Sequence, residues 1–366
     1  MRNAGVSAGA SSNGVAVPHF ASKPSRFALK ASPKTLRVVQ YGVGPIGLAA
    51  IRAVLARPDL ELVGAIDIDP ALQQRDVADL AGLRRPSGVR VSHRAQEILA
   101  VGQPDVVLHS TQSHLEDVLP QIKDCLEARA NVVSTCEEIV FPSVRQPRLT
   151  REIDALARSK GAVVLGTGVN PGFVMDTLAL ASTSPCQDVS SILVERVVDA
   201  ALRRVTLLKK VGAGLTLAEF RAEVRNRRLG HVGLVESLHL VAAGIGWELG
   251  RVTEKLTPLI AKKSIRTPHL TVKARQVSGL HHVCRGFRGG KQALQLDLQI
   301  FVGAKNPYDR IVIRGKPPLD IRLEGGLAGD EATVGMLLTM ARGIEGLKPG
   351  LRTMLDVTLP HFRSGK

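Results

Sequence analysis

The chain has 366 residues, of which 44% are hydrophobic and 3% aromatic, and its formal net charge is +16 at pH 7. This length and hydrophobic content allow about two buried cores, which excludes a disordered protein. The scarcity of aromatic residues excludes an extensive base-stacking surface for single-stranded nucleic acid, and no apolar run reaches the roughly 18–20 residues that span a bilayer.

Residues 1–34 form a basic segment rich in small residues. They hold five Lys or Arg residues and no acid, among Ala, Ser, Gly and Pro. Such a composition cannot bury enough apolar surface to fold, so we predict a disordered basic tail. A transit peptide has a similar composition, but no Arg-rich amphipathic helix is evident here.

From Leu36 onward, short β-branched runs alternate with helical patterns, as in βαβ units. The predicted strands are Arg37–Tyr41, Leu60–Ile66, Asp105–His109, Asn131–Ser134 and Ala162–Leu165. The predicted helices are Ile46–Ala56, Leu115–Ala128 and Leu149–Lys160. We therefore expect an α/β protein whose residues 35–170 form a Rossmann domain with a doubly wound parallel sheet.

After about residue 176 the order of elements changes. A strand near Ser191–Val198 precedes helical stretches at Leu217–Arg227 and Val232–Leu249, and alternating segments run from 270 to 323 before a helix at Glu331–Ile344. This order predicts an α+β domain with a mainly antiparallel sheet over residues 171–345, for substrate binding and dimerisation. We expect residues 346–366 to pack back on the Rossmann domain.

A GxGxxG pattern lies between the first predicted strand and its helix. Its first glycine permits a tight turn, its second lets backbone amides approach a pyrophosphate, and its third lets the helix lie close to the strand. A proline suits the first helical turn that follows. The residues predicted here to bind NAD or NADP are Gly42, Val43, Gly44, Pro45, Ile46 and Gly47.

Asp67 ends the second predicted strand. An acid at this place accepts hydrogen bonds from the adenosine ribose hydroxyls and repels a 2′-phosphate, which favours NAD over NADP. Arg75 is close in sequence and can hold such a phosphate, so NADP stays open.

Small polar residues follow the next two strands. Ser110, Thr111 and Gln112 come after His109, and Thr135 comes after Ser134. Ligands of doubly wound sheets bind at the carboxyl edge of the strands, so we assign these residues to the nicotinamide half of the cofactor. Alternatively, Ser110 or Ser113 caps the helix that begins near Leu115.

Glu137 and Glu138 follow a buried strand and precede an apolar run, so they are candidate catalytic residues. The alternative is ordinary surface charge. Neighbours on an extended strand point to opposite faces, so we expect one of the two to enter the cleft, with Glu137 preferred.

A carboxylate beside a nicotinamide favours an amine as substrate. Hydride loss from an alcohol develops an oxyanion and needs a cationic or neutral donor, whereas hydride loss from an amine develops an iminium that an anion stabilises. Cys136 is a weaker candidate nucleophile, because two adjacent acids disfavour its thiolate. The four cysteines show no CxxC spacing, so we expect no metal site, no disulfide framework and a cytoplasmic protein.

The segment Gly166–Asp176 (GTGVNPGFVMD) follows the last Rossmann strand. So many turn residues between two domains predict a shaped loop beside a pocket. We expect Asn170 to bind the cofactor carboxamide or the substrate, and Phe173 and Met175 to form an apolar wall. Packing at the domain junction is the alternative role.

Four segments in this order resemble the 2,4-diaminopentanoate dehydrogenase family, which includes native amine dehydrogenases and shares its N-terminal fold with dihydrodipicolinate reductases. They are NVVSTCEEIVFP at Asn131–Pro142, GTGVNPGFVMD at Gly166–Asp176, GHVGLVES at Gly230–Ser237 and GDEAT at Gly329–Thr333. The resemblance covers residues 36–362.

The resemblance implies NAD(P)-dependent oxidative deamination of an amine or diamino acid to a ketone and ammonia, with the reverse reductive amination, in a homodimer. It places the catalytic glutamate on the Glu137–Glu138 pair. It assigns substrate contacts to Asn170 and Phe173, and further ones to His231 and Glu236, for which a helix cap region and a solvated helix face are the alternatives.

Two other functions stay open. A dihydrodipicolinate-reductase-like or alcohol oxidoreductase has the same fold, but His281-His282 is not followed here by that family's lysine-containing motif. An NAD-sensing DNA-binding regulator needs a recognition helix, and the basic stretch Arg221–Arg228 has no suitable partner helix before it. We therefore expect small-molecule partners, without nucleic acid or membrane.

Overall fold

The computed structural model describes residues 34–201, 204–226 and 229–364. The predicted tail therefore lies outside the described residues, except for Lys34, as do the last two arginines of the basic stretch Arg221–Arg228. All elements below belong to one unit, Thr35–Lys366.

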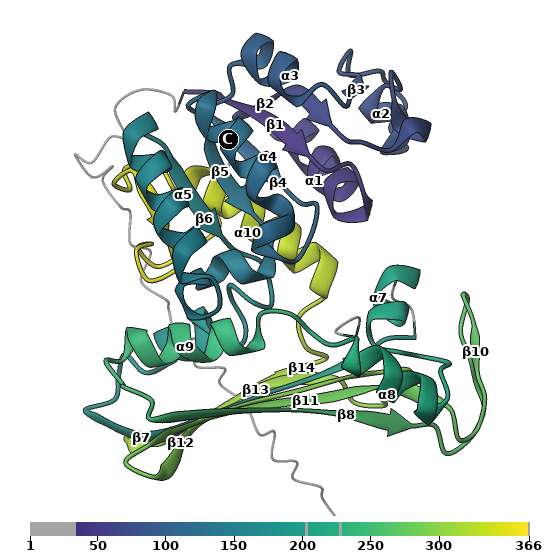
Figure 1. The fold of residues 1–366 in the computed structure, drawn as a ribbon, viewed down its shortest axis with the longest axis vertical. Coiled ribbons are helices and arrows are strands. Elements are labelled where there is room, and N and C mark those ends of the chain that lie inside the picture. The colour runs from purple at the N-terminus through teal and green to yellow at the C-terminus, as the bar shows by residue number, and fades with distance from the viewer. Residues whose placement is uncertain (1–33, 202–203, 227–228, 365–366) are drawn as a thin grey trace, which may run out of the picture. The chain divides into compact units, whose positions relative to one another are not determined.

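A seven-stranded parallel sheet forms the first half of this unit, with strand order β15-β6-β5-β4-β1-β2-β3 (Figure 1). Its strands are β1 Leu36–Tyr41, β2 Leu60–Ile66, β3 Val91–Ser92, β4 Val106–His109, β5 Asn131–Ser134, β6 Val163–Gly166 and β15 Gly350–Arg352. The five predicted strands are all present, because each contains adjacent apolar residues and most of its positions are buried within the sheet.

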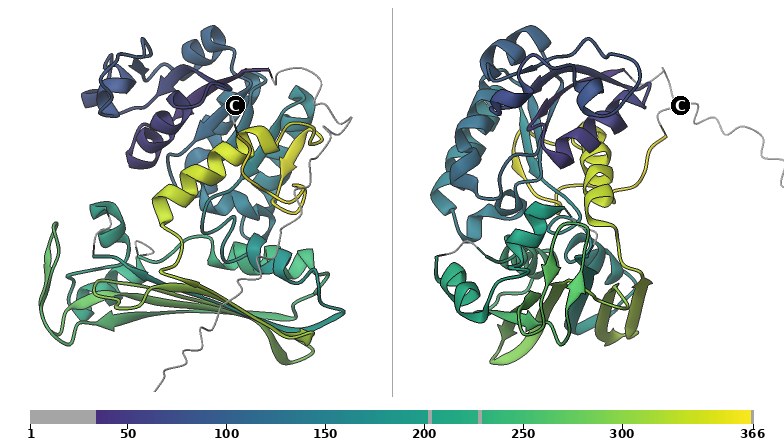
Figure 2. Two further views of the ribbon diagram at one scale, coloured as in Figure 1. Left: turned by 180° about the vertical axis from the view of Figure 1, so that it is seen from behind. Right: turned by 90° about the vertical axis from the view of Figure 1, so that its right-hand side faces the viewer.

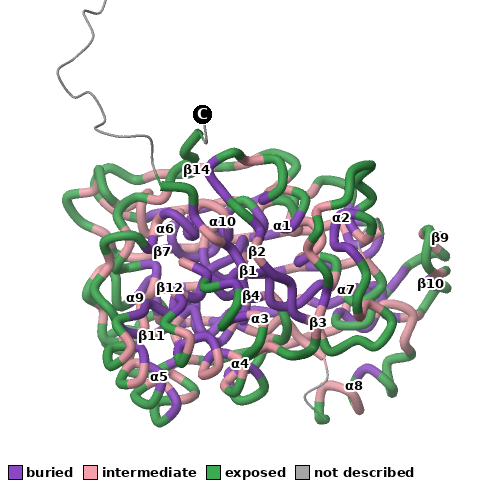
Figure 3. Tube along the Cα trace, turned by 90° about the horizontal axis from the view of Figure 1, so that it is seen from above, coloured by how far each residue is buried: buried purple, intermediate pink, exposed green. Residues whose placement is uncertain are grey.

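Helices cover both faces of this sheet. Val38 and Val39 are adjacent on β1 and therefore point to opposite faces of the sheet. Both are fully buried, so both faces are covered. Val38 packs in a cluster with α1 Pro45–Leu55 and α10 Gly329–Gly343, whereas Val39 packs with α3 Ala95–Gly102, α4 Leu115–Glu127 and α5 Pro147–Lys160. Figure 3 shows the buried interior along β1 and β4. The predicted doubly wound fold is confirmed.

Short elements link these helices and strands. They are α2 Val77–Leu80 and the 3₁₀ helices Pro70–Leu72, Glu137–Val140 and Pro142–Val144. The segment with the glutamate pair was expected to continue as an extended strand. It is instead a 3₁₀ helix, because β5 ends at Ser134 and the backbone amide of Ile139 turns back to donate to the carbonyl of Cys136 at 3.0 Å.

A six-stranded sheet forms the second half, in the order β14-β13-β7-β12-β11-β8. Its strands are β7 Asp188–Asp199, β8 Arg251–Ile260, β11 Val277–Arg288, β12 Lys291–Phe301, β13 Tyr308–Lys316 and β14 Leu319–Glu324. Only β7 and β12 pair in parallel among these described strands, so the predicted mainly antiparallel sheet is confirmed. The strands β9 Ile265–Arg266 and β10 Thr271–Val272 form a separate antiparallel pair.

The remaining helices are α6 Thr177–Ser182, α7 Val205–Lys210, α8 Leu217–Arg225 and α9 Leu234–Gly244. The central one for the site is α9, which packs on β11 and β12 and also contacts the 3₁₀ helix Glu137–Val140. Its residues Leu238 and Val241 are fully buried in the core of the second half. Helix α9 therefore joins the second sheet to the edge of the first.

The chain returns to the first sheet at its end. Helix α10 was expected to belong to the second domain, yet it packs against α1, and β15 pairs in parallel with β6 (Figure 2, yellow-green to yellow). Residues 329–352 thus complete the first half of the structure. No helix among the described residues is long and apolar enough to cross a membrane.

Candidate active site

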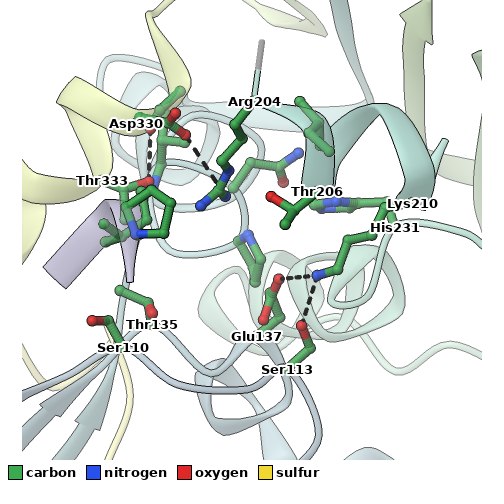
Figure 4. Close-up of a pocket in the computed structure, with 18 of the residues that line it drawn as sticks. Ser110, Ser113, Thr135, Glu137, Arg204, Thr206, Lys210, His231, Asp330 and Thr333 are labelled. Atoms are coloured by element: carbon green, nitrogen blue, oxygen red, sulfur yellow. Dashed lines mark hydrogen bonds and ion pairs between the residues drawn. The ribbon is translucent and has the colours of Figure 1, made fainter. Parts of the chain in front are cut away.

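A cavity of about 360 Å³ is lined by residues from both halves of the structure (Figure 4). Its wall includes the start of α1, the segments that follow β4, β5 and β6, and residues of β7, α7 and α10. The carboxyl ends of parallel strands meet at this edge of the first sheet, which is where ligands bind in doubly wound folds.

The glycine-rich turn has the geometry that a dinucleotide requires. Gly42 has a φ of +90°, and a Cβ on Gly47 would lie 1.9 Å from the carbonyl oxygen of Gly42, so the turn and helix are in direct contact. A Cβ on Gly44 would meet nothing within 4 Å, and Gly44 and Pro45 line the cavity. The open backbone at the N-terminus of α1 therefore fits a pyrophosphate.

Asp67 lies beside this turn. Its Oδ2 accepts a hydrogen bond from the backbone amide of Val43 at 2.6 Å, and its Oδ1 accepts one from the amide of Asp69 at 2.9 Å. The carboxylate is thus held at the end of β2, next to the predicted cofactor turn. Arg75 is exposed.

The polar residues after β4 and β5 line the cavity as a group: Ser110, Thr111, Gln112, Ser113 and Thr135. The hydroxyl of Ser110 accepts a hydrogen bond from Gln40 at 2.8 Å. The expectation that Ser110 or Ser113 caps the following helix is wrong, because α4 has no side-chain cap from either and its first amide, at Leu115, donates to Glu138 instead.

Glu137 and Glu138 point to different places. Glu137 lines the cavity, whereas the carboxylate of Glu138 is buried between α4 and the 3₁₀ helix. Glu138 Oε2 accepts from the amide of Leu115 at 2.8 Å, and its Oε1 lies 2.9 Å from His114 Nδ1. Only Glu137 is therefore placed to meet a ligand in the cavity.

Lys210, at the end of α7, is the partner of Glu137. Its Nζ donates to the hydroxyl of Ser113 at 2.8 Å and lies 3.5 Å from Glu137 Oε1 (Figure 4). Lys210 carries no local sequence pattern, and it lies 73 positions after Glu137 in the chain, so it was not among the predicted site residues. Only the packing of α7 over the first sheet's edge brings the two together.

Four buried polar atoms of the cavity wall have no hydrogen-bond partner among the described residues: Thr167 Oγ1, Asn170 Oδ1, Arg204 Nε and His231 Nε2. Burial, together with the nearby charge of Lys210, lowers the pKa of His231 to about 3, so its ring is neutral at physiological pH. Buried polar groups of native proteins are normally paired, so these atoms mark where a polar ligand fits.

Phe173 and Met175 do not appear among the described residues that line the cavity. Met175 is fully buried in the core of the second half, and Phe173 packs where the two cores meet. The predicted apolar wall is therefore wrong for these two residues, because the chain turns into the core after Pro171.

Two further candidates lie away from the cavity. Glu236 is fully buried rather than on a solvated helix face, and Arg145 Nε donates to its Oε1 at 2.8 Å while burial raises the pKa of this carboxyl. Burial also raises the pKa of the Cys136 thiol, which donates to the carbonyl of Ser113. A nucleophilic thiolate at Cys136 is thus disfavoured. No group of three His, Cys, Asp or Glu residues in the described part of the chain is arranged to hold a metal ion.

The cavity has two other basic residues that the sequence did not single out. Arg196, on β7, forms a buried ion pair with Asp309 at 2.6 Å, and Arg204 lies 3.7 Å from Asp330, at the start of α10. Each of these arginines thus faces an acid.

Family models match most of the chain. Residues 173–366 match the 2,4-diaminopentanoate dehydrogenase C-terminal domain, and residues 36–136 match the N-terminus of dihydrodipicolinate reductase. The 2,4-diaminopentanoate dehydrogenase of Acetoanaerobium sticklandii is 30% identical over 337 residues, which cover 90% of this chain and 95% of that protein. An amine dehydrogenase of Streptomyces virginiae is 22% identical, over 88% of this chain and 96% of that one.

A solved structure shares the fold. The amine dehydrogenase from Mycobacterium smegmatis superposes with a TM-score of 0.82 at 24% identity, covering 91% of this chain and 98% of that one. The resemblance that the four sequence segments indicated is thus confirmed over the length of the described unit. The chain belongs to the 2,4-diaminopentanoate dehydrogenase family.

Proposed function

We propose that the protein is an NAD(P)-dependent amine dehydrogenase that interconverts an amine, or a diamino acid, with a ketone and ammonia. The observation that carries this proposal is the position of Glu137. Its side chain lines the cavity that also holds Gly44 and Pro45 of the cofactor turn and the unpaired amide oxygen of Asn170. The family membership supports it, as do the similarities to a 2,4-diaminopentanoate dehydrogenase and to an amine dehydrogenase.

The residues that hold the cofactor are those of the turn and the strand ends. The amides at the start of α1 bind the pyrophosphate, Asp67 the adenosine ribose, and Ser110, Thr111, Gln112 and Thr135 the nicotinamide half. Asn170 Oδ1 accepts from the carboxamide or the substrate amine. A nicotinamide held by these residues would supply hydride chemistry at the amine carbon. Among the residues that the structure describes, no basic side chain pairs with Asp67, which supports NAD over NADP.

Glu137 acts on the substrate nitrogen. Its anion holds the substrate ammonium, accepts a proton from nitrogen and stabilises the positive charge that develops as the carbon–hydrogen bond breaks. An alcohol dehydrogenase would instead require a donor to an oxyanion at this position. The neutral ring of His231 and the hydroxyl of Thr167 orient polar atoms of the substrate.

The test follows the oxidation of NADH and NADPH with a panel of ketones, with and without ammonia, and the reduction of NAD and NADP with the corresponding amines and alcohols. We expect ammonia-dependent oxidation of the reduced cofactor and amine-dependent reduction of the oxidised one. Ketone reduction that ignores ammonia, together with oxidation of the alcohols, would reject the amine substrate and favour an alcohol oxidoreductase.

A further inference from the structure

The ammonium of Lys210 has one proton more than its two contacts use. A lysine ammonium donates up to three hydrogen bonds. One goes to Ser113 Oγ at 2.8 Å and a second faces Glu137 Oε1 at 3.5 Å. Lys210 also lines the cavity, and no third contact of its Nζ is found within residues 34–201, 204–226 and 229–364, so the third donor faces a ligand there.

The ion pair between Lys210 and Glu137 is loose enough to open. The side chain of Lys210 is 49% exposed and that of Glu137 is 21% exposed, and 3.5 Å is longer than a good charge-assisted hydrogen bond. Such half-exposed pairs contribute little to stability. Both groups can therefore take new partners on a substrate while they stay near each other.

Lys210 is distinguished from the other basic residues of the cavity by its partner. Arg196 is paired with Asp309, and Arg204 faces Asp330. The ring of His231 is neutral, since burial lowers its pKa to about 3. Lys210 is thus the cation that stands beside the carboxylate of Glu137.

Reductive amination develops first a negative and then a positive charge on the groups bonded to one substrate carbon. Addition of ammonia to a ketone puts negative charge on oxygen, and departure of that oxygen as water leaves a positive iminium. The first event needs a proton donor and the second an anion. A carboxylate anion alone stabilises only the positive charge on nitrogen.

We propose that Lys210 is a second catalytic residue, which delivers a proton to the substrate oxygen while Glu137 acts on the nitrogen. This inference rests on the amine dehydrogenase function proposed above. Lys210 thus acts on the oxygen bonded to the reacting carbon, and Glu137 acts on the nitrogen bonded to it.

Ammonia attacks the carbonyl carbon, the Lys210 ammonium gives a proton to the new alkoxide, and Glu137 takes one from the added nitrogen. That proton returns from Glu137 to the neutral lysine amine, which stands across the ion pair. Lys210 then protonates the hydroxyl, the carbon–oxygen bond breaks, and water leaves the iminium. After hydride transfer, Lys210 recovers its proton from solvent.

The experiment compares Lys210→Met and Lys210→Arg with Lys209→Met, which removes the exposed neighbouring lysine on the same helix. With ketone and saturating ammonia, we expect both Lys210 variants to lose on the order of 10²-fold or more in kcat, the range of a proton-transfer group. Lys209→Met stays within about twofold, as is usual for an exposed residue. NADH affinity, measured by fluorescence, stays unchanged in all three.

Two measurements separate proton donation from a structural role. A preformed cyclic ketimine needs no ammonia addition or loss of water, so Lys210→Met should reduce it at nearly the wild-type rate while Glu137→Gln does not. With 4-deuterated NADH, the isotope effect on ketone amination should fall towards one in Lys210→Met, because water loss then limits turnover.

Full activity of Lys210→Arg would overturn the inference, because an arginine keeps the charge but gives up no proton. Unchanged ketone amination by Lys210→Met would overturn it as well, as would an isotope effect that persists at a reduced rate. Failure of the proposed function itself is a different result: the wild type then oxidises NADH without any dependence on ammonia.

Discussion

The carboxylate of Glu138 accepts a hydrogen bond from the backbone amide of Leu115 at 2.8 Å, at the first turn of α4, and lies 2.9 Å from the ring of His114. A buried carboxylate at a helix N-terminus pairs an amide that the helix itself leaves unpaired and complements the helix dipole. Glu138, the neighbour of the candidate catalytic residue Glu137, therefore has a structural role.

Glu138→Ala should lower the free energy of unfolding by about 1–3 kcal/mol, because it leaves the Leu115 amide without its partner. Glu138→Gln should lose less, since its amide oxygen still accepts. Urea denaturation measures both, with Glu137→Ala as the matched control that stays within about 0.5 kcal/mol of wild type. Equal stability of Glu138→Ala and Glu137→Ala would show that the cap contributes nothing.

The glycines of the cofactor turn allow a paired test. A Cβ on Gly47 meets the Gly42 carbonyl at 1.9 Å, whereas a Cβ on Gly44 meets nothing within 4 Å. Gly47→Ala should therefore lower the unfolding free energy by about 1–3 kcal/mol. Gly44→Ala should fold with normal stability but weaken NADH binding by on the order of tenfold, because its methyl group occupies the pyrophosphate's approach. Thermal unfolding and fluorescence titration check the two effects, and normal NADH affinity in Gly44→Ala would contradict the placement of the cofactor.

Asp67 should control the choice between the two cofactors. Its carboxylate is held at the end of β2 by the amide of Val43, where it repels a 2′-phosphate. We expect the wild type to bind NADH more tightly than NADPH, and Asp67→Asn to reduce that preference by on the order of tenfold. The exposed Asp69→Asn is the control. Tighter binding of NADPH by the wild type would be contrary to this assignment.

His109 should make the fold sensitive to acid. Burial lowers the pKa of this fully buried ring to about 4, and the ring nitrogens are paired with Ser134 at 2.9 Å and Gln121 at 2.7 Å. His109 takes up a proton near pH 6.5 in the unfolded chain but only near pH 4 in the folded protein. The contribution of the neutral ring to the free energy of unfolding is therefore complete above pH 6.5 and declines as the pH falls from 6.5 to 4. The loss is up to about 3 kcal/mol.

The check is the unfolding free energy of wild type and His109→Gln between pH 7 and pH 4. The variant should lose less stability over this window, whatever its stability at pH 7. Asp76, whose pKa is lowered to about 2 by hydrogen bonds that outweigh its burial, loses its stabilising contribution mainly below pH 4 and so outside this window. If the unfolding free energies of wild type and His109→Gln fall in parallel with pH, His109 is not the source of the acid sensitivity.

Sequence patterns located the first sheet because its strands are buried on both faces and read as short apolar runs. Strand β2 has the predicted bounds, Leu60–Ile66. Strand β8, Arg251–Ile260, escaped prediction, because it lies at the edge of its sheet and none of its residues is fully buried. A half-solvated edge strand carries little hydrophobic signal.

The candidate site was predictable where its residues follow strands. Glu137, Thr135 and Asn170 all come directly after a strand of the first sheet, and the topology of such sheets brings those positions to one edge. Lys210 and Asp330 had no such signal, since they reach the cavity only through the packing of α7 and α10. Met175 was misplaced because its apolar side chain suits a core as well as a pocket.

The central claim is that the Glu137 carboxylate acts on the substrate nitrogen, and Glu137→Gln tests it most directly, with Glu138→Gln as the control. In ammonia-dependent ketone reduction, Glu137→Gln should lose 10²–10⁴-fold in kcat, the usual range for a proton-transfer group, while NADH affinity and stability stay normal. Glu138→Gln should keep kcat close to that of the wild type. Comparable turnover by Glu137→Gln and the wild type, or a loss confined to Glu138→Gln, would contradict the account.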